Sequence, residues 1–229
     1  MDSSAEQFYD SVSNEYTDFV VRCIPRYEEM LLSLFKYIPT SFSPRTILDL
    51  GCGTGNLTCL ITKYYPEAKI IAVDISKECI DKCKKRTAHL KIQYIKEDFR
   101  KLTFRENSID LIMSSIAIHH LDDEEKARFF KDVYKWQSYN GILSICDQFR
   151  GETSFVYEKH IELWKSFAYG QGATDKEWNL WMDHQATHDY HASLFNYMKW
   201  LRNTGYFNID CTWRNLLWAN LYAQKFKQK

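Results

Sequence analysis

The sequence lacks an excess of charge of either sign, and this absence limits the partners that the chain is expected to bind. Lysine and arginine together number 30, and aspartate and glutamate also number 30, so the formal net charge is zero. Proteins that bind the phosphate backbone of DNA or RNA normally carry a basic excess. The charge balance therefore disfavours a nucleic-acid partner, although a local basic patch is compatible with it.

Long apolar runs and paired cysteine motifs are missing as well. No apolar run approaches the roughly 20 residues that cross a bilayer, and no charged and then apolar leader opens the chain. The seven cysteines are an odd number, are scattered, and include no CxxC pair. Buried thiols that act as small hydrophobic side chains account for them best. We therefore expect a cytoplasmic protein with no membrane partner.

What the sequence does contain is enough apolar material for one α/β domain. The chain has 229 residues, of which 45% are hydrophobic, and its 15 tyrosines and 7 tryptophans suit a core and an aromatic-lined pocket. Strand-like and helix-like segments alternate through the first 150 residues, which predicts a parallel sheet. No internal repeat or low-complexity tract is visible.

Capping residues and turn residues set the expected boundaries of several elements. Ser76 is placed to begin one helix, and Asp122 with Glu125 forms a capping box for another that continues to about Gln137. The segment 139–141 reads as a turn before a strand at 142–146. A helix around 194–204, a break at Gly205 and two strand-like runs at 207–213 and 216–223 end the chain.

Two segments outside this alternation are expected to be helical. Aromatic and apolar residues spaced three and four apart between Phe8 and Val20 predict one amphipathic helix, and a second apolar stretch covers 30–35. From Gly151 the alternation lapses for about forty residues rich in Trp, Tyr, Phe and His, where we expect two further helices.

The stretch Thr46–Gly55 carries most of the functional information. Ile47 to Leu50 reads as the end of a buried strand with one carboxylate, Asp49, near its tip, and the glycines that follow allow a tight turn before a helix begins around Asn56. A dinucleotide-binding fingerprint would place its third glycine at position 56. The spacing therefore argues against a nicotinamide or flavin cofactor.

The segment Asp49–Gly55 resembles motif I of the class I S-adenosylmethionine-dependent methyltransferases. Three further segments match that family in the required order: 70–74 as a second strand ending in an acid, 92–99 as a third strand and adenine-binding turn, and 109–121 as a fourth strand and its loop. The resemblance is strong over 46–150 and weak in the flanks.

The resemblance implies a Rossmann-like, seven-stranded, mostly parallel sheet with an antiparallel C-terminal hairpin and helices on both faces. It divides a single domain, 1–229, into an N-terminal helical lid (1–45), a cofactor-binding core (46–150), a substrate-cap insertion after the fifth strand (151–192) and a final helix and hairpin (193–229). Packing of the first helix on the sheet is the alternative to its role as a lid.

The resemblance also implies S-adenosylmethionine as cofactor and S-adenosylhomocysteine as product. The carboxylate of Asp74 would accept from the ribose hydroxyls and that of Asp98 from the adenine amino group, while Ile75 and Phe99 would enclose the adenine. Asp49 would orient the glycine loop. The predicted cofactor-binding residues are Tyr16, Asp49, Gly51, Cys52, Gly53, Asp74, Ile75, Asp98, Phe99 and Ser115.

Methyl transfer is an in-line displacement, so the protein must mainly align the acceptor and exclude water, with a base only where the acceptor loses a proton. His119 and His120 follow the fourth strand, at the position that borders the methyl group in the family. We predict both as catalytic residues and favour His119 as the base, because histidine exchanges a proton near neutral pH. A role in orienting the loop is the alternative.

Histidines 184, 188 and 191, with Asp183 and Asp189 nearby, are spaced so that a helix could bring them together on a metal. Solvated or substrate-facing side chains are the simpler interpretation, and we expect no metal. Six tryptophans, at 164, 178, 181, 200, 213 and 218, are candidates for an acceptor pocket, although core packing is the simpler role for each one.

The predicted function is methyl transfer to a small or medium-sized, aromatic or apolar acceptor. A carboxy-S-adenosylmethionine synthase or a tRNA-modification enzyme is an alternative that would need a cation for an extra carboxylate, with Arg202 or Arg214 as possible donors. A catalytically silent module that binds cofactor or a protein is a third. Monomer and homodimer both remain open.

Overall fold

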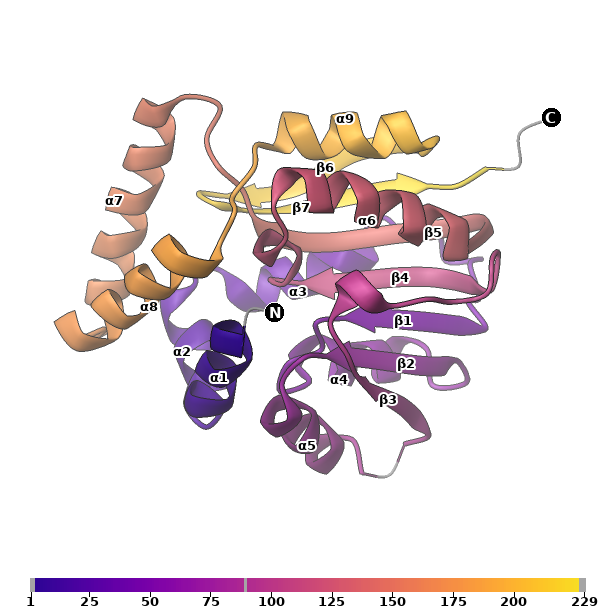
Figure 1. The fold of residues 1–229 in the computed structure, drawn as a ribbon, viewed down its shortest axis with the longest axis horizontal. Coiled ribbons are helices and arrows are strands. Elements are labelled where there is room, and N and C mark those ends of the chain that lie inside the picture. Colours follow the sequence, from indigo (N-terminus) through magenta and orange to yellow (C-terminus); the bar gives the residue numbers. More distant parts are fainter. Residues whose placement is uncertain (1–2, 89, 227–229) are drawn as a thin grey trace.

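A seven-stranded sheet forms the centre of the molecule (Figure 1). The computed structural model describes residues 3–88 and 90–226, so the extreme ends of the predicted 1–229 domain lie outside the described residues. The strand order is β3-β2-β1-β4-β5-β7-β6. The strands are β1 (Thr46–Leu50), β2 (Lys69–Asp74), β3 (Ile92–Lys96), β4 (Ile109–Ser115), β5 (Gln137–Gln148), β6 (Phe207–Asn215) and β7 (Trp218–Gln224).

The pairing of the strands confirms the predicted topology. Strands β1 to β5 run parallel to one another, whereas β7 pairs antiparallel with both β5 and β6. The chain order reverses between β1 and its neighbours β2 and β4, which creates a crevice at the carboxyl ends of these strands. Ligands bind at that edge in sheets of this type. The carboxyl ends of β1, which carries Asp49, and of β2, which ends at Asp74, both lie there.

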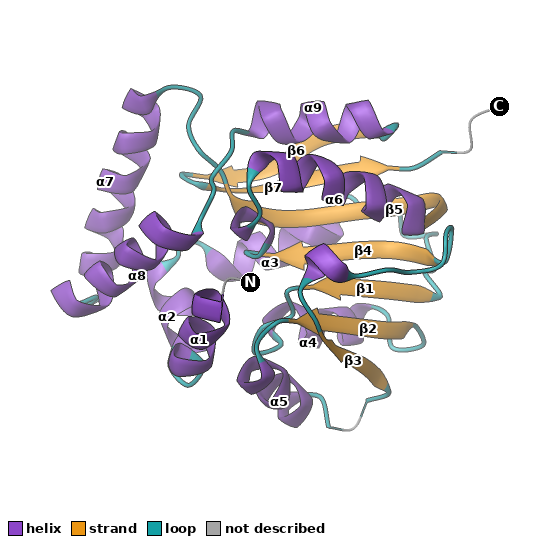
Figure 2. Cartoon of the chain, viewed as in Figure 1, coloured by secondary structure: helices purple, strands orange, loops and turns teal. Residues whose placement is uncertain are grey.

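Helices cover both faces of the sheet (Figure 2). One face packs against α3 (Tyr27–Lys36), α4 (Asn56–Tyr64) and α5 (Lys77–Arg86), and the other against α6 (Asp123–Trp136) and α9 (Leu194–Thr204). Alternate residues of each buried strand belong to the two cores: Ile47 faces α3 and α4, whereas Leu48 faces α6. The predicted caps of α5 and α6 are present, since Ser76 accepts from the N–H of Cys79 and Asp122 forms a capping box with Glu125.

Four helices gather at the carboxyl edge of the sheet, where the arrowheads of β1 and β4 point (Figure 1). They are α1 (Ser3–Val12), α2 (Tyr16–Cys23), α7 (Ser154–Gly170) and α8 (Asp175–His188). The two helices predicted after residue 151 are therefore present. The single helix predicted from Phe8 to Val20 is wrong, because the chain turns at 13–15 and the two halves become α1 and α2.

The N-terminal helices and the 151–192 segment contact each other directly. Trp164 of α7 donates its indole N–H to the carbonyl oxygen of Cys23, 3.0 Å away, and Arg22 of α2 is paired with Glu177 of α8. Helix α1 is held to the sheet edge by Ser76, whose hydroxyl donates to Asp10 at 2.5 Å. These contacts make one cover over the carboxyl edge from segments that are far apart in the sequence.

The predicted turn at 139–141 is also wrong, because β5 runs through it. Asn140 adopts a positive φ of 64° and the register between β4 and β5 shifts beside it, between Ile109 and Leu111, so the chain bulges without leaving the sheet. The predicted strand at 216–223 begins later, at Trp218, since Leu216 lies in the hairpin turn with φ 51°. Two short 3-10 helices, η1 (Phe99–Lys101) and η2 (Ile118–His120), complete the described elements.

Among the described residues, no helix combines the length and the apolar character that crossing a bilayer requires.

Candidate active site

The glycine loop after β1 is held against β2 and against the loop after β4. Gly51 has φ +70°, and a Cβ built on it would lie 2.3 Å from the Cβ of Ala117, so a side chain has no room there. The N–H of Gly53 donates to Asp74 at 2.7 Å. The loop is thereby placed with bare backbone facing the crevice at the strand ends.

A recess opens beside this loop, at the carboxyl ends of the strands. Seven of the ten predicted cofactor-binding residues line it: Tyr16, Gly51, Gly53, Asp74, Ile75, Asp98 and Phe99. Cys52 and Ser115 line a smaller hollow that continues from it past Tyr16 and the glycines. The structure therefore brings nine of the ten residues to two hollows that share Tyr16, Gly51 and Gly53 as walls; we call the larger one the cofactor recess.

Asp74 is the most constrained acid of the cofactor recess. One carboxylate oxygen accepts from Gly53 and the other accepts from the N–H of Ser76 at 2.9 Å. Burial raises the pKa of Asp74, and the N–H donors of Ser76 and Gly53 oppose that shift. Because each carboxylate oxygen has two lone pairs, both oxygens keep the capacity to accept a ligand hydroxyl.

Asp98 and Arg100 shape the opposite wall of the cofactor recess. Asp98 caps η1 by accepting from the N–H of Arg100, and the Arg100 guanidinium contacts both Asp98 and Glu125. The same guanidinium donates to the carbonyl oxygen of His120 at 2.9 Å. Arg100 thus ties the turn after β3 to the loop that carries the histidines, a role that the sequence reasoning did not foresee.

Asp49 lies away from the cofactor recess. Its side chain is fully buried under α4, where it accepts from the hydroxyl of Thr58 at 2.6 Å, while its other carboxylate oxygen has no hydrogen-bond partner among the described residues. Burial raises the pKa of Asp49 to about 7. Among the described residues its hydrogen bond is to Thr58 of α4, the helix that follows the glycine loop, and its predicted role in orienting that loop stays a prediction.

A second recess adjoins the first beneath the helical cover. It shares Tyr9, Tyr16 and Ile116 with the cofactor recess. Its other walls come from α2, α7 and α8, from η2, from the end of β5 and from the segments after α2 and α8. The residues are Phe19, Val20, Ile24, His119, Gln148, Trp164, Trp181, His184, Gln185 and Asp189. We call this cavity the acceptor recess; it is aromatic along its length and polar at one end.

His119 lies at that polar end and is almost completely buried. Its ring Nδ1 donates to Asp147 of β5, and its backbone N–H donates to the same carboxylate at 3.0 Å. Burial disfavours the charged ring, but Asp147 and Asp189 outweigh it and raise the pKa of His119. Because Asp147 occupies Nδ1, the Nε2 atom is the one presented toward the acceptor recess.

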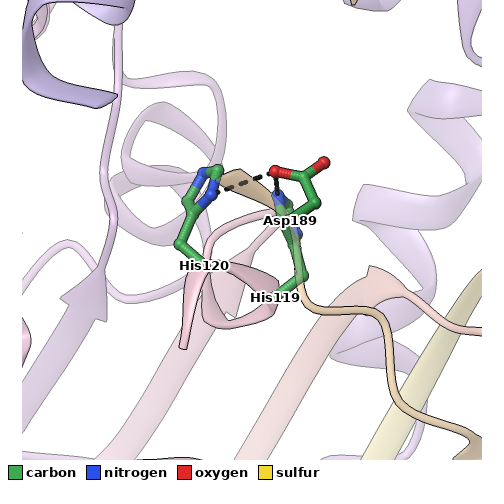
Figure 3. Close-up of side chains that lie close together, drawn as sticks. All are labelled: His119, His120 and Asp189. Carbon is green, nitrogen blue, oxygen red and sulfur yellow. Dashed lines mark ion pairs between the residues drawn. The ribbon is translucent and has the colours of Figure 1, made fainter. Parts of the chain in front are cut away.

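His120 faces the cofactor recess and contacts both parts of the cover. Its Nε2 atom lies 2.9 Å from the hydroxyl of Tyr9, and its Nδ1 atom lies 3.2 Å from the carbonyl oxygen of His188 and 3.1 Å from Oδ1 of Asp189. Figure 3 shows the rings of His119 and His120 turned toward the Asp189 carboxylate. The predicted catalytic pair therefore meets an acid from the distant 151–192 segment.

The predicted histidine group of the cap does not gather by itself, because α8 ends between its members. Instead His184 and His191 each approach Asp189, with Nε2 to carboxylate oxygen distances of 3.6 Å. Burial lowers the pKa of His184 to about 3 and also lowers the pKa of His191. Burial would raise the pKa of Asp189, but the surrounding histidines, His119 foremost, hold it well below its usual range.

The tryptophans divide between site and core. Trp164 and Trp181 line the acceptor recess, whereas Trp178 and Trp218 pack against Trp164 in the core behind it. The other two lie elsewhere: Trp213 donates to Glu29 at 3.0 Å and Trp200 packs beside Tyr197. Arg202 and Arg214, the possible donors for an extra carboxylate, line neither recess.

Sequence reasoning missed Asp147 and Gln148 as site residues because it ended the fifth strand at 146. Both lie at the carboxyl end of β5, the position that the sheet topology makes functional. A predicted strand extended by two residues would have found them. Asp189 was noted in the sequence only as a neighbour of the histidines at 184, 188 and 191; its contacts with His119 and His120 had no signal, because they depend on how the chain returns after α8.

Comparison with known proteins supports this assignment of the fold. A family model described as "Methyltransferase domain" matches residues 47–141. The chain is 30% identical over 145 residues to the malonyl-[acyl-carrier protein] O-methyltransferase of Halalkalibacterium halodurans, which covers 62% of this chain and 51% of that enzyme. The chain thus spans about half the length of this relative.

Two further proteins are similar over more of the chain. The carboxy-S-adenosyl-L-methionine synthase of Klebsiella pneumoniae is 23% identical over 177 residues, covering 74% of this chain and 71% of the synthase. The phosphoethanolamine N-methyltransferase 2 of Haemonchus contortus, solved with S-adenosyl-L-methionine, superposes with a TM-score of 0.70 at 14% identity, over 95% of this chain and 57% of that one. The methyltransferase-domain match and these similarities, together with the glycine loop and the acidic strand ends, support a class I S-adenosylmethionine-dependent methyltransferase.

Proposed function

We propose that this chain transfers the methyl group of S-adenosylmethionine, bound in the cofactor recess, to a small or medium-sized acceptor bound in the acceptor recess. The observation that carries the proposal is that the two recesses adjoin, with Tyr9, Tyr16 and Ile116 forming walls of both. In-line displacement needs the acceptor atom and the methyl group in contact and shielded from water. Adjoining recesses under one helical cover supply that arrangement.

In the cofactor recess, the proposed contacts follow the donors and acceptors that are available. Asp74 accepts from the ribose hydroxyls, Asp98 from the adenine amino group, and Ile75 and Phe99 enclose the adenine ring. Backbone N–H groups of the glycine loop and the N-terminus of α4 meet the methionine carboxylate. Cys52 and Ser115 line the hollow on that side, where they contribute shape and one hydroxyl.

The acceptor recess supports an acceptor with an aromatic or apolar body and one polar end. Phe19, Trp164 and Trp181 offer apolar faces along it, and His119, Gln148 and Asp189 offer polar groups at one end. His119 and His120 are therefore proposed as the catalytic residues that meet the reacting end of the acceptor.

We also propose a cytoplasmic location. The seven cysteines, all free thiols, are compatible with a reducing compartment.

Titration with cofactor tests the first part of this proposal. Asp74→Ala removes both the acceptor of the ribose hydroxyls and the bond to Gly53, so we expect S-adenosylhomocysteine affinity to fall by at least about 100-fold, as expected for the loss of two charge-assisted hydrogen bonds. Calorimetry measures it on folded protein, with folding checked by circular dichroism.

Asp132→Ala serves as the matched control, because Asp132 is a half-exposed acid of α6 that pairs with Lys135 and lines neither recess. Its cofactor affinity should equal that of the unmodified chain. Unchanged affinity in Asp74→Ala would show that the cofactor recess has been assigned to the wrong ligand.

Mass spectrometry of small molecules released from freshly purified protein distinguishes methyl transfer from synthesis of a carboxylated cofactor. We expect S-adenosylmethionine or S-adenosylhomocysteine, because Arg202 and Arg214 lie away from the recesses and Arg100 is already paired with Asp98 and Glu125. Recovery of carboxy-S-adenosylmethionine would favour the synthase instead.

A further inference from the structure

A buried cluster of nitrogen and oxygen atoms lies where the two recesses meet. His120 lines the cofactor recess, whereas His119 and Asp189 line the acceptor recess. One ligand atom from each of these three residues lies within 4.8 Å of the other two. Two histidines on one loop and a carboxylate on a distant segment therefore converge on a single point (Figure 3).

The separations within this cluster are compatible with metal coordination, and one of them, between Asp189 and His119, is longer than a hydrogen bond. Oδ1 of Asp189 lies 3.6 Å from Nε2 of His119 and 3.1 Å from Nδ1 of His120. A separation of 3.6 Å is too long for a hydrogen bond. Ligand atoms that are each about 2.0–2.2 Å from one zinc ion are about 3.0–3.5 Å apart, which is close to the observed spacing.

One oxygen of the buried Asp189 carboxylate also lacks a hydrogen bond. The Asp189 side chain is only 4% exposed, and its Oδ1 atom has no hydrogen-bond partner among the described residues. Nε2 of His191, 3.6 Å from the other carboxylate oxygen, is similarly buried and unpartnered there. A buried carboxylate in this condition is costly unless it is paired with a cation.

The hydrogen bonds that the imidazole rings of His119 and His120 make outside the cluster leave one nitrogen of each ring available as a ligand. Asp147 receives the Nδ1 proton of His119, so Nε2 carries the lone pair, as in the carboxylate–histidine–metal arrangement. His120 places Nε2 against the Tyr9 hydroxyl, which lets Nδ1 act as the ligand. The carbonyl oxygen of His188, 3.2 Å from that Nδ1, accepts its proton when no cation is present.

We propose that Nε2 of His119, Nδ1 of His120 and Oδ1 of Asp189 bind one divalent transition-metal ion, with zinc as the expected ion. Imidazole nitrogens favour such ions over magnesium or calcium. Three protein ligands leave at least one coordination position open, as in catalytic rather than structural zinc sites. That position faces the acceptor recess, where a heteroatom of the acceptor would occupy it; this last step alone rests on the proposed function.

Metal titration of the untagged, chelator-treated full chain tests the site without any cofactor or acceptor. We expect one equivalent of Zn²⁺ to bind with a Kd of about 1 μM or tighter by calorimetry, Co²⁺ to give a visible absorption band, and Mg²⁺ to give no heat. Asp189→Asn keeps the size of the side chain but removes its charge. It should weaken Zn²⁺ binding by more than the roughly 10–100-fold that loss of an outer contact costs.

His160→Gln is the matched control, because His160 is a histidine of α7 that belongs to neither recess. It should bind Zn²⁺ as the unmodified chain does. If Asp189→Asn fails to fold by circular dichroism, His120→Gln replaces it with the same expected loss. No stoichiometric binding, an unchanged affinity in the ligand variants, or an equal loss in His160→Gln would each overturn the site.

Calorimetry with S-adenosylhomocysteine on the same metal-free protein separates this inference from the proposed function. Cofactor binding without zinc binding overturns the metal site and leaves methyl transfer in place. Zinc binding without cofactor binding supports the metal site and contradicts the cofactor assignment.

Discussion

Asp49 illustrates how a carboxylate at a strand end can act on stability rather than on a ligand. Its side chain is buried with one hydrogen bond, from Thr58, and burial raises its pKa to about 7. The folded chain therefore keeps the proton of Asp49 at a pH where the unfolded chain has released it. Ionisation of this group opposes folding.

This environment predicts that the cofactor-free protein loses stability as the pH rises from about 4 to 7. Between these values the folded state binds more protons than the unfolded state, so the free energy of unfolding falls with pH. A shift of about three pKa units corresponds to about 4 kcal/mol. Asp49→Asn should make this decline smaller, as measured by urea denaturation at pH 5 and pH 8, while the raised pKa values of Asp74 and His119 leave a remainder.

Asp132→Asn is the control, because that acid is half exposed and has an ion-pair partner. It should keep the decline of the unmodified chain. An unchanged decline in Asp49→Asn would mean that other groups cause it.

Residue types at strand ends were the most predictable part of the site. Gly51, Gly53, Asp74 and Asp98 follow directly from strands, and parallel strands place their ends at one edge of the sheet. Asp189 was not predictable in this way, because it reaches His119 and His120 only through the return of the chain after α8. Contacts between segments 70 residues apart have no local pattern in the sequence.

At the scale of elements, α6 fixes the position of the loop that bears both histidines. The capping box at Asp122 begins this helix directly after η2 and Leu121, and Glu125 of the box also pairs with Arg100. The same acid therefore links the helix start to the wall of the cofactor recess. Loss of the cap should loosen the loop as well as the helix.

We expect Asp122→Ala to lower the free energy of unfolding by about 1 kcal/mol, since it leaves the N–H of Glu125 without its side-chain acceptor. Urea denaturation at pH 7 measures the change. Glu124→Ala, at an acid of the same first turn whose side chain is 88% exposed, should change stability by less than about 0.5 kcal/mol. Equal effects of the two substitutions would show that helix charge, not capping, is responsible.

Apolar periodicity and capping residues predicted that most helices and strands exist. They predicted less well where a helix is interrupted or where a strand continues through turn residues. The spacing of apolar residues from Phe8 to Val20 suits one helix, yet the break at 13–15 lets α1 dock on Ser76 while α2 packs under α7. At Tyr139 to Gly141 the sequence has turn residues, but pairing with β4 keeps the chain in the sheet as a bulge. In both places tertiary contacts outweigh the local preference.

At the scale of the whole molecule, the cover over the two recesses consists of segments from the first 23 residues and from 154–188. Tyr9 and Tyr16 are common to both recesses, and Tyr9 also contacts His120 and His184. The cover joins the sheet edge through side chains more than through backbone pairing. Such a region opens at lower free energy than the central strands do.

Cofactor binding is therefore expected to slow amide hydrogen exchange in the cover. S-adenosylhomocysteine at about 100 times its Kd stabilises the bound state by about 2.7 kcal/mol, which corresponds to roughly 100-fold slower opening of segments that must move for release. Peptides from α1 should show this slowing by mass spectrometry, and peptides from α8 a smaller one through the Tyr9–His184 contact. Peptides from the edge strand β6, which lines neither recess, should change least. If α1 exchanges at the same rate with and without ligand, then Tyr9 and Tyr16 only pack on the sheet, and access to the cofactor recess is not controlled by the N-terminal helices.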